Sequence, residues 1–191
     1  FAGYRPSDAQ MAVKPPMHPA STFVFSDART GAAHMETAYG IEGAETPPEG
    51  FIYSRLGNPT VTMAEERLAA WDSSEDAALF GSGMAAISTA LMAWSGADRP
   101  VWFVGPLYGG TYHFLDEVLP SMGREVAELS HLDELQDTLE TRGGVRPGII
   151  YLETPANPTM QIQRIRQAAE WAAMHSTNDH RIVVMVDNTY L

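Results

Sequence analysis

The chain has 191 residues, of which 45% are hydrophobic, so it can form one domain with a sizeable core, or one domain and an arm. Its formal net charge of -12, from 24 acidic and 12 basic residues, argues against a non-specific nucleic-acid surface. The absence of cysteine excludes disulfides and thiolate metal sites and leaves the redox compartment undetermined, so a cytoplasmic location is our default expectation. No apolar run could span a bilayer, and we expect neither a membrane nor a nucleic-acid partner.

Residues 1–57 are expected to form an irregular N-terminal arm. Two proline pairs, Pro15-Pro16 and Pro47-Pro48, prevent a helix across their own positions. Between them, residues 27–39 are compatible with one short helix. We expect such an arm to pack on another body, for example a second subunit.

Strands and helices alternate regularly from residue 58 onward. Asn58 suits a helix N-cap and Pro59 the first helical position. Ser130 and Asp133 predict a capping box ahead of a later helix. The expected helices cover 59–71, 84–94, 110–119, 133–141 and 162–175, and the expected strands cover 77–80, 101–104, 125–129, 148–152 and 182–186. This order predicts an α/β fold in which residues 58–191 form a mostly parallel sheet with helices on both faces.

The last predicted strand, residues 182–186, consists of five apolar residues and is expected to be buried on both faces. Asp187 follows it directly. Ligands of open parallel sheets bind outside the carboxyl ends of the strands, where a carboxylate can hold a positive charge of the ligand. Asp187 could equally well cap the turn that follows.

Three other strand ends carry residues that could contact the same ligand. Residues 81–84 place glycines at a helix N-terminus, which favours an anion. Tyr108 lies beside two glycines, and Glu153 and Asn157 share one polar turn. Together with Asp187, these residues suit a planar, phosphorylated ligand with a ring nitrogen, such as pyridoxal 5′-phosphate (PLP). Each feature alone is also common in ordinary turns.

Other site classes fit the pattern less well. Residues 81–86 match the G-x-G-x-x-A fingerprint of an NAD(P)-binding oxidoreductase, but the next strand ends in Gly105-Pro106 rather than in the acid that would hold a ribose. The six histidines are scattered without a ligand motif, so no metal site is predicted. A nucleophilic Ser82 would need a glycine at position 84, where the chain has Met84.

With these motifs in view, the chain resembles the PLP-dependent enzymes of cysteine and methionine metabolism, which include cystathionine γ-synthase, the cystathionine lyases, methionine γ-lyase and the O-acylhomoserine sulfhydrylases. The matching segments, in the family's order, are residues 53–60, 82–87, 107–111, 153–158 and 186–189. The resemblance implies the PLP-dependent transferase fold type I and PLP as cofactor. It also implies γ- or β-elimination, or γ-replacement, at a C–S or C–O bond of a homoserine- or cysteine-derived amino acid.

The resemblance also implies which residues bind the cofactor phosphate. Gly83 and Met84 would offer backbone amides to it, with Ser82 beside them. Tyr53 and Arg55 would reach the phosphate of a neighbouring subunit. The N-terminal arm would then complete an intersubunit site, so we expect a homo-oligomer, a dimer of dimers.

Five further residues are implied around the cofactor ring. Tyr108 would stack on the ring and help to move protons, and Asp187 would pair with the protonated ring nitrogen. Asn157 would lie beside the ring hydroxyl and Thr189 close to the ring, while Glu153 would have a supporting role. Tyr108 and Asp187 are therefore the candidate catalytic residues.

The chain departs from the family pattern in its lysines. The lysine that forms the Schiff base with PLP is expected beyond Leu191, and the only lysine here, Lys14, lies in the arm. We therefore expect the chain to be the N-terminal half of a family member; a truncated or degenerate homologue that binds cofactor or a partner without turnover is the alternative. Position 110 is glycine, where typical methionine γ-lyases have cysteine, and elimination is not distinguished from replacement.

Overall fold

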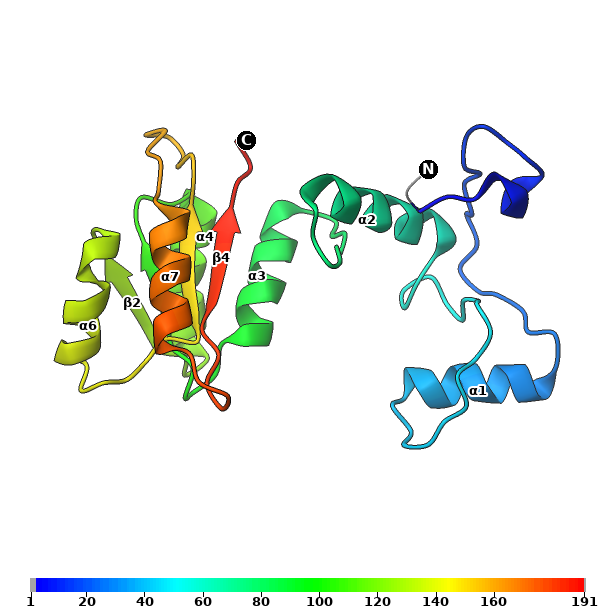
Figure 1. Cartoon of the computed structure of the whole chain (residues 1–191), viewed down its shortest axis with the longest axis horizontal. Helices are drawn as coiled ribbons and strands as arrows, with labels where there is room; N and C mark the ends of the chain where they lie inside the picture. Colours follow the sequence, from blue (N-terminus) through cyan, green and yellow to red (C-terminus); the bar gives the residue numbers. More distant parts are fainter. Residues whose placement is uncertain (1–2, 191) are drawn as a thin grey trace. The chain divides into compact units, whose positions relative to one another are not determined.

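The computed structural model describes residues 3–190, which fall into two compact units with their boundary in the sequence between Leu79 and Phe80 (Figure 1). The first unit contains the expected arm together with helix α2 (Pro59–Asp72). The sequence predicted a boundary after residue 57, where regular strand and helix patterns begin. The boundary between the compact units lies later, after Leu79. Each unit is described by itself.

The first unit is mostly irregular, with a short 3-10 helix η1 (Pro6–Ala9) and helices α1 (Ala28–Ala38) and α2. The side chain of Asp27 caps α1 by accepting the N–H of Thr30 at 2.8 Å. The predicted cap of α2 is confirmed, since Asn58 Oδ1 accepts the N–H of Thr60 at 2.9 Å. Two arm segments, residues 21–23 and 52–54, run antiparallel and bridge at Thr22 and Tyr53.

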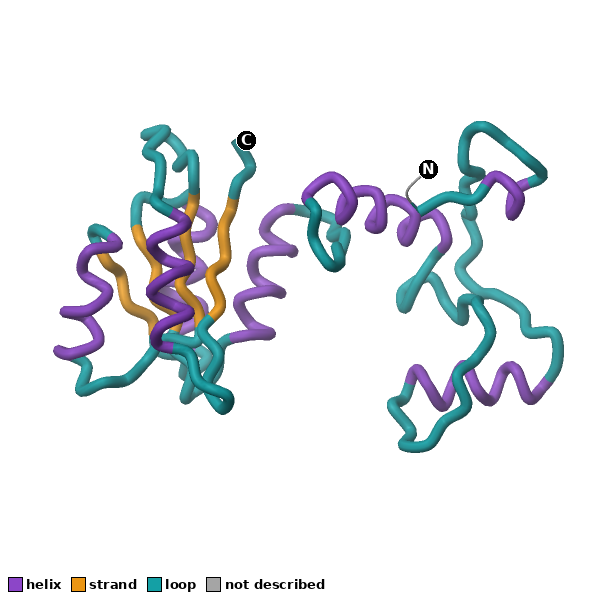
Figure 2. The backbone as a smooth tube through the Cα atoms, viewed as in Figure 1, coloured by secondary structure: helices purple, strands orange, loops and turns teal. Residues whose placement is uncertain are grey.

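The second unit is built on a sheet of four parallel strands in the order β2-β1-β3-β4 (Figure 2). The strands are β1 (Val101–Val104), β2 (Val126–Leu129), β3 (Ile149–Glu153) and β4 (Val183–Asp187). Because all four strands are parallel, their carboxyl ends lie at one edge of the sheet. The predicted parallel α/β architecture is confirmed.

Helices cover both faces of this sheet, as expected (Figure 1). One face packs on 3-10 helix η3 (Leu132–Glu134), α6 (Leu135–Thr141) and α7 (Ile165–His175) through a cluster that includes Trp102 and Trp171. The other face packs on α3 (Gly83–Trp94), α4 (Gly109–His113), π-helical turn η2 (Phe114–Val118) and α5 (Leu119–Ser121). Within residues 3–190, no helix is long and apolar enough to cross a membrane.

Two strand predictions are wrong. Residues 77–80 form no strand, because no other segment among residues 3–190 pairs with them; Leu79 and Phe80 are 45% and 44% exposed. The final strand is not buried on both faces. β4 lies at an edge of the described sheet, where all five of its residues remain partly exposed.

Two helix starts also differ from the prediction. The N–H of Ser130 is accepted by Glu134 at 3.0 Å, so Glu134 rather than Asp133 completes this helix start, while Asp133 pairs with Arg164 at 2.8 Å. Helix α7 begins at Ile165 rather than near residue 162. The preceding Gln163 is bound to the turn after β3, where its N–H donates to Thr154 Oγ1 at 3.0 Å.

We predict that Asn58→Ala destabilises the first unit more than Asp27→Ala does. Asn58 is 7% exposed, and its amide also donates to the carbonyl of His18 and to Ser54 Oγ, each at 3.0 Å. Loss of the cap costs about 1 kcal/mol, and the buried groups left without a partner add about 1–2 kcal/mol. Asp27 is an exposed cap with a smaller expected effect. Urea unfolding of both variants tests this ranking, and equal losses would contradict it.

Candidate active site

The four expected strand-end segments meet in one pocket of the second unit. Its volume is about 390 Å³. The residues that line it are Ser82, Gly83, Met84, Ile87, Tyr108, Glu153, Asn157, Asp187, Thr189 and Tyr190. The structure therefore brings together eight of the ten predicted site residues, and Tyr53 and Arg55 are the two outside the pocket.

The N-terminus of α3 offers two free amides to this pocket. Ser82 caps the helix, because its Oγ accepts the N–H of Ala85 at 3.1 Å and its carbonyl accepts the N–H of Ala86 at 3.1 Å. Among residues 3–190, no acceptor is present for the N–H groups of Gly83 and Met84. Two amides without acceptors at the start of a 12-residue helix form a suitable place for an anion.

Asp187 is the last residue of β4 and lines the same pocket. Its Oδ1 accepts the N–H of Thr189 at 3.1 Å and the Thr189 hydroxyl at 2.6 Å. Both of these hydrogen bonds are made by Oδ1. Asp187 therefore caps the following turn with one oxygen, and its role toward a ligand stays a prediction.

Tyr108 precedes α4, and its ring lies against the first turn of that helix. Its side chain is 47% exposed on the pocket side of the sheet edge. A Cβ atom added at Gly110 would lie 2.7 Å from Tyr108 Cε1 and 3.3 Å from Met84 Sδ. The glycine at position 110 therefore leaves room for the tyrosine ring, and a larger residue there would require the ring to move.

Glu153 is the last residue of β3, and Asn157 lies in the turn that follows. Glu153 is 3% exposed, and each of its carboxylate oxygens accepts a backbone N–H. Asn157 is half-buried and lines the pocket. Glu153 is thus a buried carboxylate at the end of a strand rather than a solvated turn acid.

Tyr151 is a residue near the site that the sequence analysis missed. It is 3% exposed on β3, and its hydroxyl has no hydrogen-bond partner among residues 3–190. Burial, followed by the negative charge of Asp187, raises the pKa of Tyr151 above its ordinary value. The alternation of side chains along a strand could have placed it on the face of Glu153, two residues further on.

Tyr53 and Arg55 lie together in the first unit, where the Arg55 guanidinium carbon is 5.6 Å from the centroid of the Tyr53 ring. This cation–π arrangement leaves the guanidinium available to an anion. Their expected contact with the phosphate of a neighbouring subunit stays a prediction.

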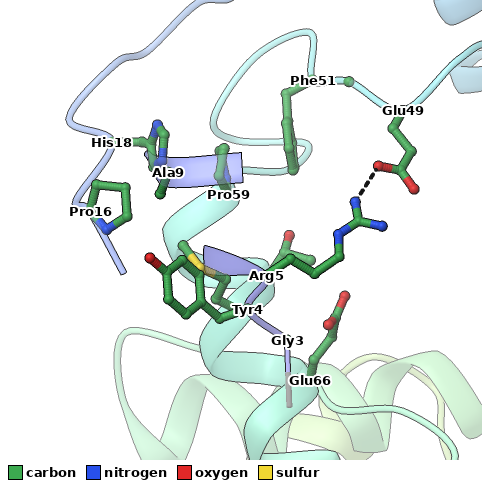
Figure 3. A pocket seen from close by; sticks show the side chains of 13 residues that line it. Gly3, Tyr4, Arg5, Ala9, Pro16, His18, Glu49, Phe51, Pro59 and Glu66 are labelled. Atoms are coloured by element: carbon green, nitrogen blue, oxygen red, sulfur yellow. Dashed lines mark hydrogen bonds and ion pairs between the residues drawn. The ribbon is translucent and has the colours of Figure 1, made fainter. Parts of the chain in front are cut away.

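A larger cavity, with a volume of about 740 Å³, lies in the first unit (Figure 3). It contains none of the predicted site residues, and Arg5 and Glu49 in its wall form an ion pair at 2.8 Å. Within residues 3–190, no cluster of three or more His, Cys, Asp or Glu could hold a metal ion. The nicotinamide alternative also lacks support, because β1 ends at Val104 and is followed by Gly105.

Comparison with known protein families gives one match over nearly the whole chain. The family described as Cys/Met metabolism PLP-dependent enzyme matches residues 2–191. An L-methionine gamma-lyase from Porphyromonas gingivalis is 37% identical over 177 residues, which are 92% of this chain and 40% of that protein. A cystathionine beta-lyase from Bacillus subtilis is 33% identical over 87% of this chain and 41% of that protein. The chain thus spans about two fifths of the length of these relatives.

Solved structures agree with this match. A Campylobacter jejuni structure described as an O-acetylhomoserine (thiol)-lyase aligns with a TM-score of 0.79 and 27% identity, over 98% of this chain and 42% of that chain. It contains a pyridoxyl-lysine 5′-monophosphate residue. The metB protein of Corynebacterium glutamicum aligns with a TM-score of 0.73 and 24% identity, over 98% of this chain and 43% of that chain, and it supports the fold. The expected PLP-dependent fold type I is confirmed.

We predict that Tyr151→Phe reduces the loss of stability at alkaline pH. Because the pKa of Tyr151 is raised on folding, the folded state keeps its proton longer than the unfolded state does. The contribution of protonated Tyr151 to the free energy of unfolding is complete below about pH 10 and falls as the pH rises further. At neutral pH the substitution should change the free energy of unfolding by less than about 1 kcal/mol, because the hydroxyl has no partner.

Urea unfolding at pH 8 and at pH 10.5 measures this effect. Tyr39→Phe is the control, because the Tyr39 side chain is 80% exposed. If the two variants change alike between these pH values, burial of Tyr151 does not have the predicted consequence.

Proposed function

This chain belongs to the Cys/Met metabolism PLP-dependent enzyme family, and we propose that the protein that contains it breaks or exchanges carbon–sulfur bonds of amino acids. The observation that carries the proposal is the meeting of three strand ends and the N-terminus of α3 in one pocket, which is lined both by Gly83 and Met84, with their free amides, and by the Asp187 carboxylate. Small-molecule sites of α/β proteins lie at such edges.

The residues of the pocket fit PLP. The amides of Gly83 and Met84, beside Ser82, would hold the phosphate, and Tyr53 and Arg55 of a neighbouring subunit would add to that group. When bound, PLP serves as an electron sink for the carbanion formed at the substrate α-carbon.

The ring would be held by four further residues. Asp187 would use Oδ2 to keep the ring nitrogen protonated, while Thr189 fixes the other oxygen. Asn157 would lie at the ring hydroxyl. Tyr108 would cover the ring, exclude water from its face and carry a proton at its hydroxyl. The resemblance to the family implies that the Schiff-base lysine would come from polypeptide outside these residues.

The proposed substrates are homoserine- or cysteine-derived amino acids. Relatives of this chain are described as an L-methionine gamma-lyase and a cystathionine beta-lyase, both of which are lyases. Gly110 favours a site in which Tyr108 lies close to α4, since no side chain at position 110 separates them. We propose carbon–sulfur cleavage as the main reaction, with γ-replacement in the methionine and cysteine (transsulfuration) pathways as the other candidate.

A product assay distinguishes these reactions. The full-length protein, loaded with PLP, is incubated with methionine, with cystathionine, and with O-acetylhomoserine plus cysteine. Elimination yields ammonia and a 2-keto acid, whereas replacement yields a new thioether. Asp187→Ala should lower kcat/KM at least about 100-fold, because the ring nitrogen loses its counter-charge. No product from any substrate would favour a homologue that binds PLP without turnover.

The mass of the borohydride-reduced protein separates that alternative from a misassigned cofactor. An increase by one pyridoxyl group would place PLP on a lysine of the polypeptide. No mass increase together with no visible absorbance would contradict the cofactor assignment for this protein.

We further propose a cytoplasmic homo-oligomer, a dimer of dimers, in which Arg55 completes the site of a neighbouring subunit. Its support is the resemblance of residues 53–60 to the family's segment, together with the Arg55 guanidinium that lies beside the Tyr53 ring in the first unit. A site shared between subunits requires a symmetric assembly in which each arm serves the other subunit.

Mixed oligomers test the shared site. Arg55→Ala and Asp187→Ala should each be inactive alone, but refolding them together should restore roughly a quarter of the wild-type activity, because half of the sites in hybrid dimers are intact. If Arg55 serves its own subunit instead, mixing restores nothing. Wild-type subunits refolded in the same way are the control.

A further inference from the structure

The Glu153 carboxylate connects two segments of the pocket that are far apart in the sequence. Its Oε2 accepts the N–H of Tyr108 at 2.6 Å, and its Oε1 accepts the N–H of Asn157 at 2.7 Å. Tyr108 is the last residue of the turn before α4, whereas Asn157 lies in the turn after β3. One side chain therefore holds two turns that contribute different residues to the pocket.

The energetics of burial make this connection strong. A carboxylate that is 3% exposed is costly unless both oxygens are hydrogen-bonded, and here each oxygen has one backbone donor. Hydrogen bonds to an ionised acceptor are about twice as strong as neutral ones. The backbone amides cannot move away without leaving a buried charge, so the carboxylate and the two turns constrain one another.

Other contacts also hold the Tyr108 turn. Leu107 is buried in the core, and the carbonyl of Tyr108 accepts the N–H of Tyr112 at 2.9 Å. No side chain caps α4 at Tyr108, and its N–H is the donor that Glu153 accepts. Glu153 therefore supplies the hydrogen bond that ties the backbone of Tyr108 to the end of β3.

Glu153 is also adjacent to Asp187. The two residues are register partners at the ends of β3 and β4, and the N–H of Thr154 donates to the carbonyl of Asp187 at 2.9 Å. The end of β3 thus fixes three elements of the pocket: the Tyr108 turn, the Asn157 turn and the backbone that carries Asp187.

We propose that Glu153 is a positioning residue that sets the distance between Tyr108 and Asn157, and through it the fit of the cofactor ring between them. This inference rests on the proposed function, since it assigns a purpose to the pocket of a PLP enzyme. Both carboxylate oxygens are occupied by amides, so Glu153 acts through its neighbours rather than on the substrate.

Glu153→Gln in the full-length protein is the matched test. A glutamine has one acceptor oxygen, and its NH₂ group would face one of the two N–H donors, so one turn is released with almost no change of side-chain volume. The control is Glu128→Gln. Glu128 lies near the end of β2 in register with Phe103, is exposed, and within residues 3–190 accepts one hydrogen bond, from the Tyr112 hydroxyl at 3.4 Å.

Hydrogen exchange of the protein without PLP is the first measurement. The amides of Tyr108 and Asn157 should be protected in the wild type, and at least one should exchange about tenfold or more faster in Glu153→Gln. The amides inside β3 should not change in either variant. A variant that loses protection throughout β3 would show a general structural role and would overturn the proposal.

Cofactor binding is the second measurement. Glu153→Gln should raise the PLP dissociation constant about tenfold and change the visible circular dichroism of bound PLP, while Glu128→Gln should leave both unchanged. Wild-type binding with an unchanged Glu153→Gln spectrum would overturn the role of Glu153 alone. A wild type that does not bind PLP would overturn the proposed function instead.

If Glu153→Gln does not fold, the wild-type amides decide the question. Exchange of Tyr108 and Asn157 N–H as fast as that of exposed loop amides would mean that Glu153 does not hold them, and the proposal would be wrong. Protection comparable to that of the β3 amides would support it.

Discussion

The parallel pairing of four strands is the constraint on which the site depends. In a parallel sheet the carboxyl ends of all strands lie at one edge, so residues that follow β1, β3 and β4 come together although up to about 80 residues separate Tyr108 from Asp187. The register of β3 and β4 places Glu153 directly beside Asp187. The pairing of the strands thus brings the residues at the strand ends together into a site.

The sequence predicted those parts of the fold that depend on local patterns. Asn58 and Pro59 define the start of α2, and the alternation of apolar segments with helical segments defines the parallel sheet. The predictions failed where secondary structure or burial depends on a segment that is distant in the sequence. Residues 77–80 have the composition of a strand, but a strand requires a neighbour, and β4 is as apolar as a central strand although it lies at the edge of the described sheet.

The same distinction applies to the pocket. Gly83 and Met84 could be predicted because a helix N-terminus needs only its own residues, and Asp187 because it follows a strand. The role of Glu153 could not, since its second hydrogen bond joins it to Tyr108, 45 residues earlier in the chain. Nor could the sequence show that Tyr151 is buried without a partner, since that depends on how α4 and η2 pack on the sheet.

The pocket places two carboxylates side by side, and the way in which each is compensated explains their different tasks. Glu153 is buried and has two backbone donors, so its charge is already stabilised by the protein. Asp187 is partly exposed, and Thr189 donates two hydrogen bonds to its Oδ1. The interaction energy of a cationic ligand group is therefore most favourable at Oδ2 of Asp187. The neighbouring Glu153 carboxylate adds to the negative potential there. A protonated ring nitrogen meets both requirements, because it is positively charged and donates one hydrogen bond.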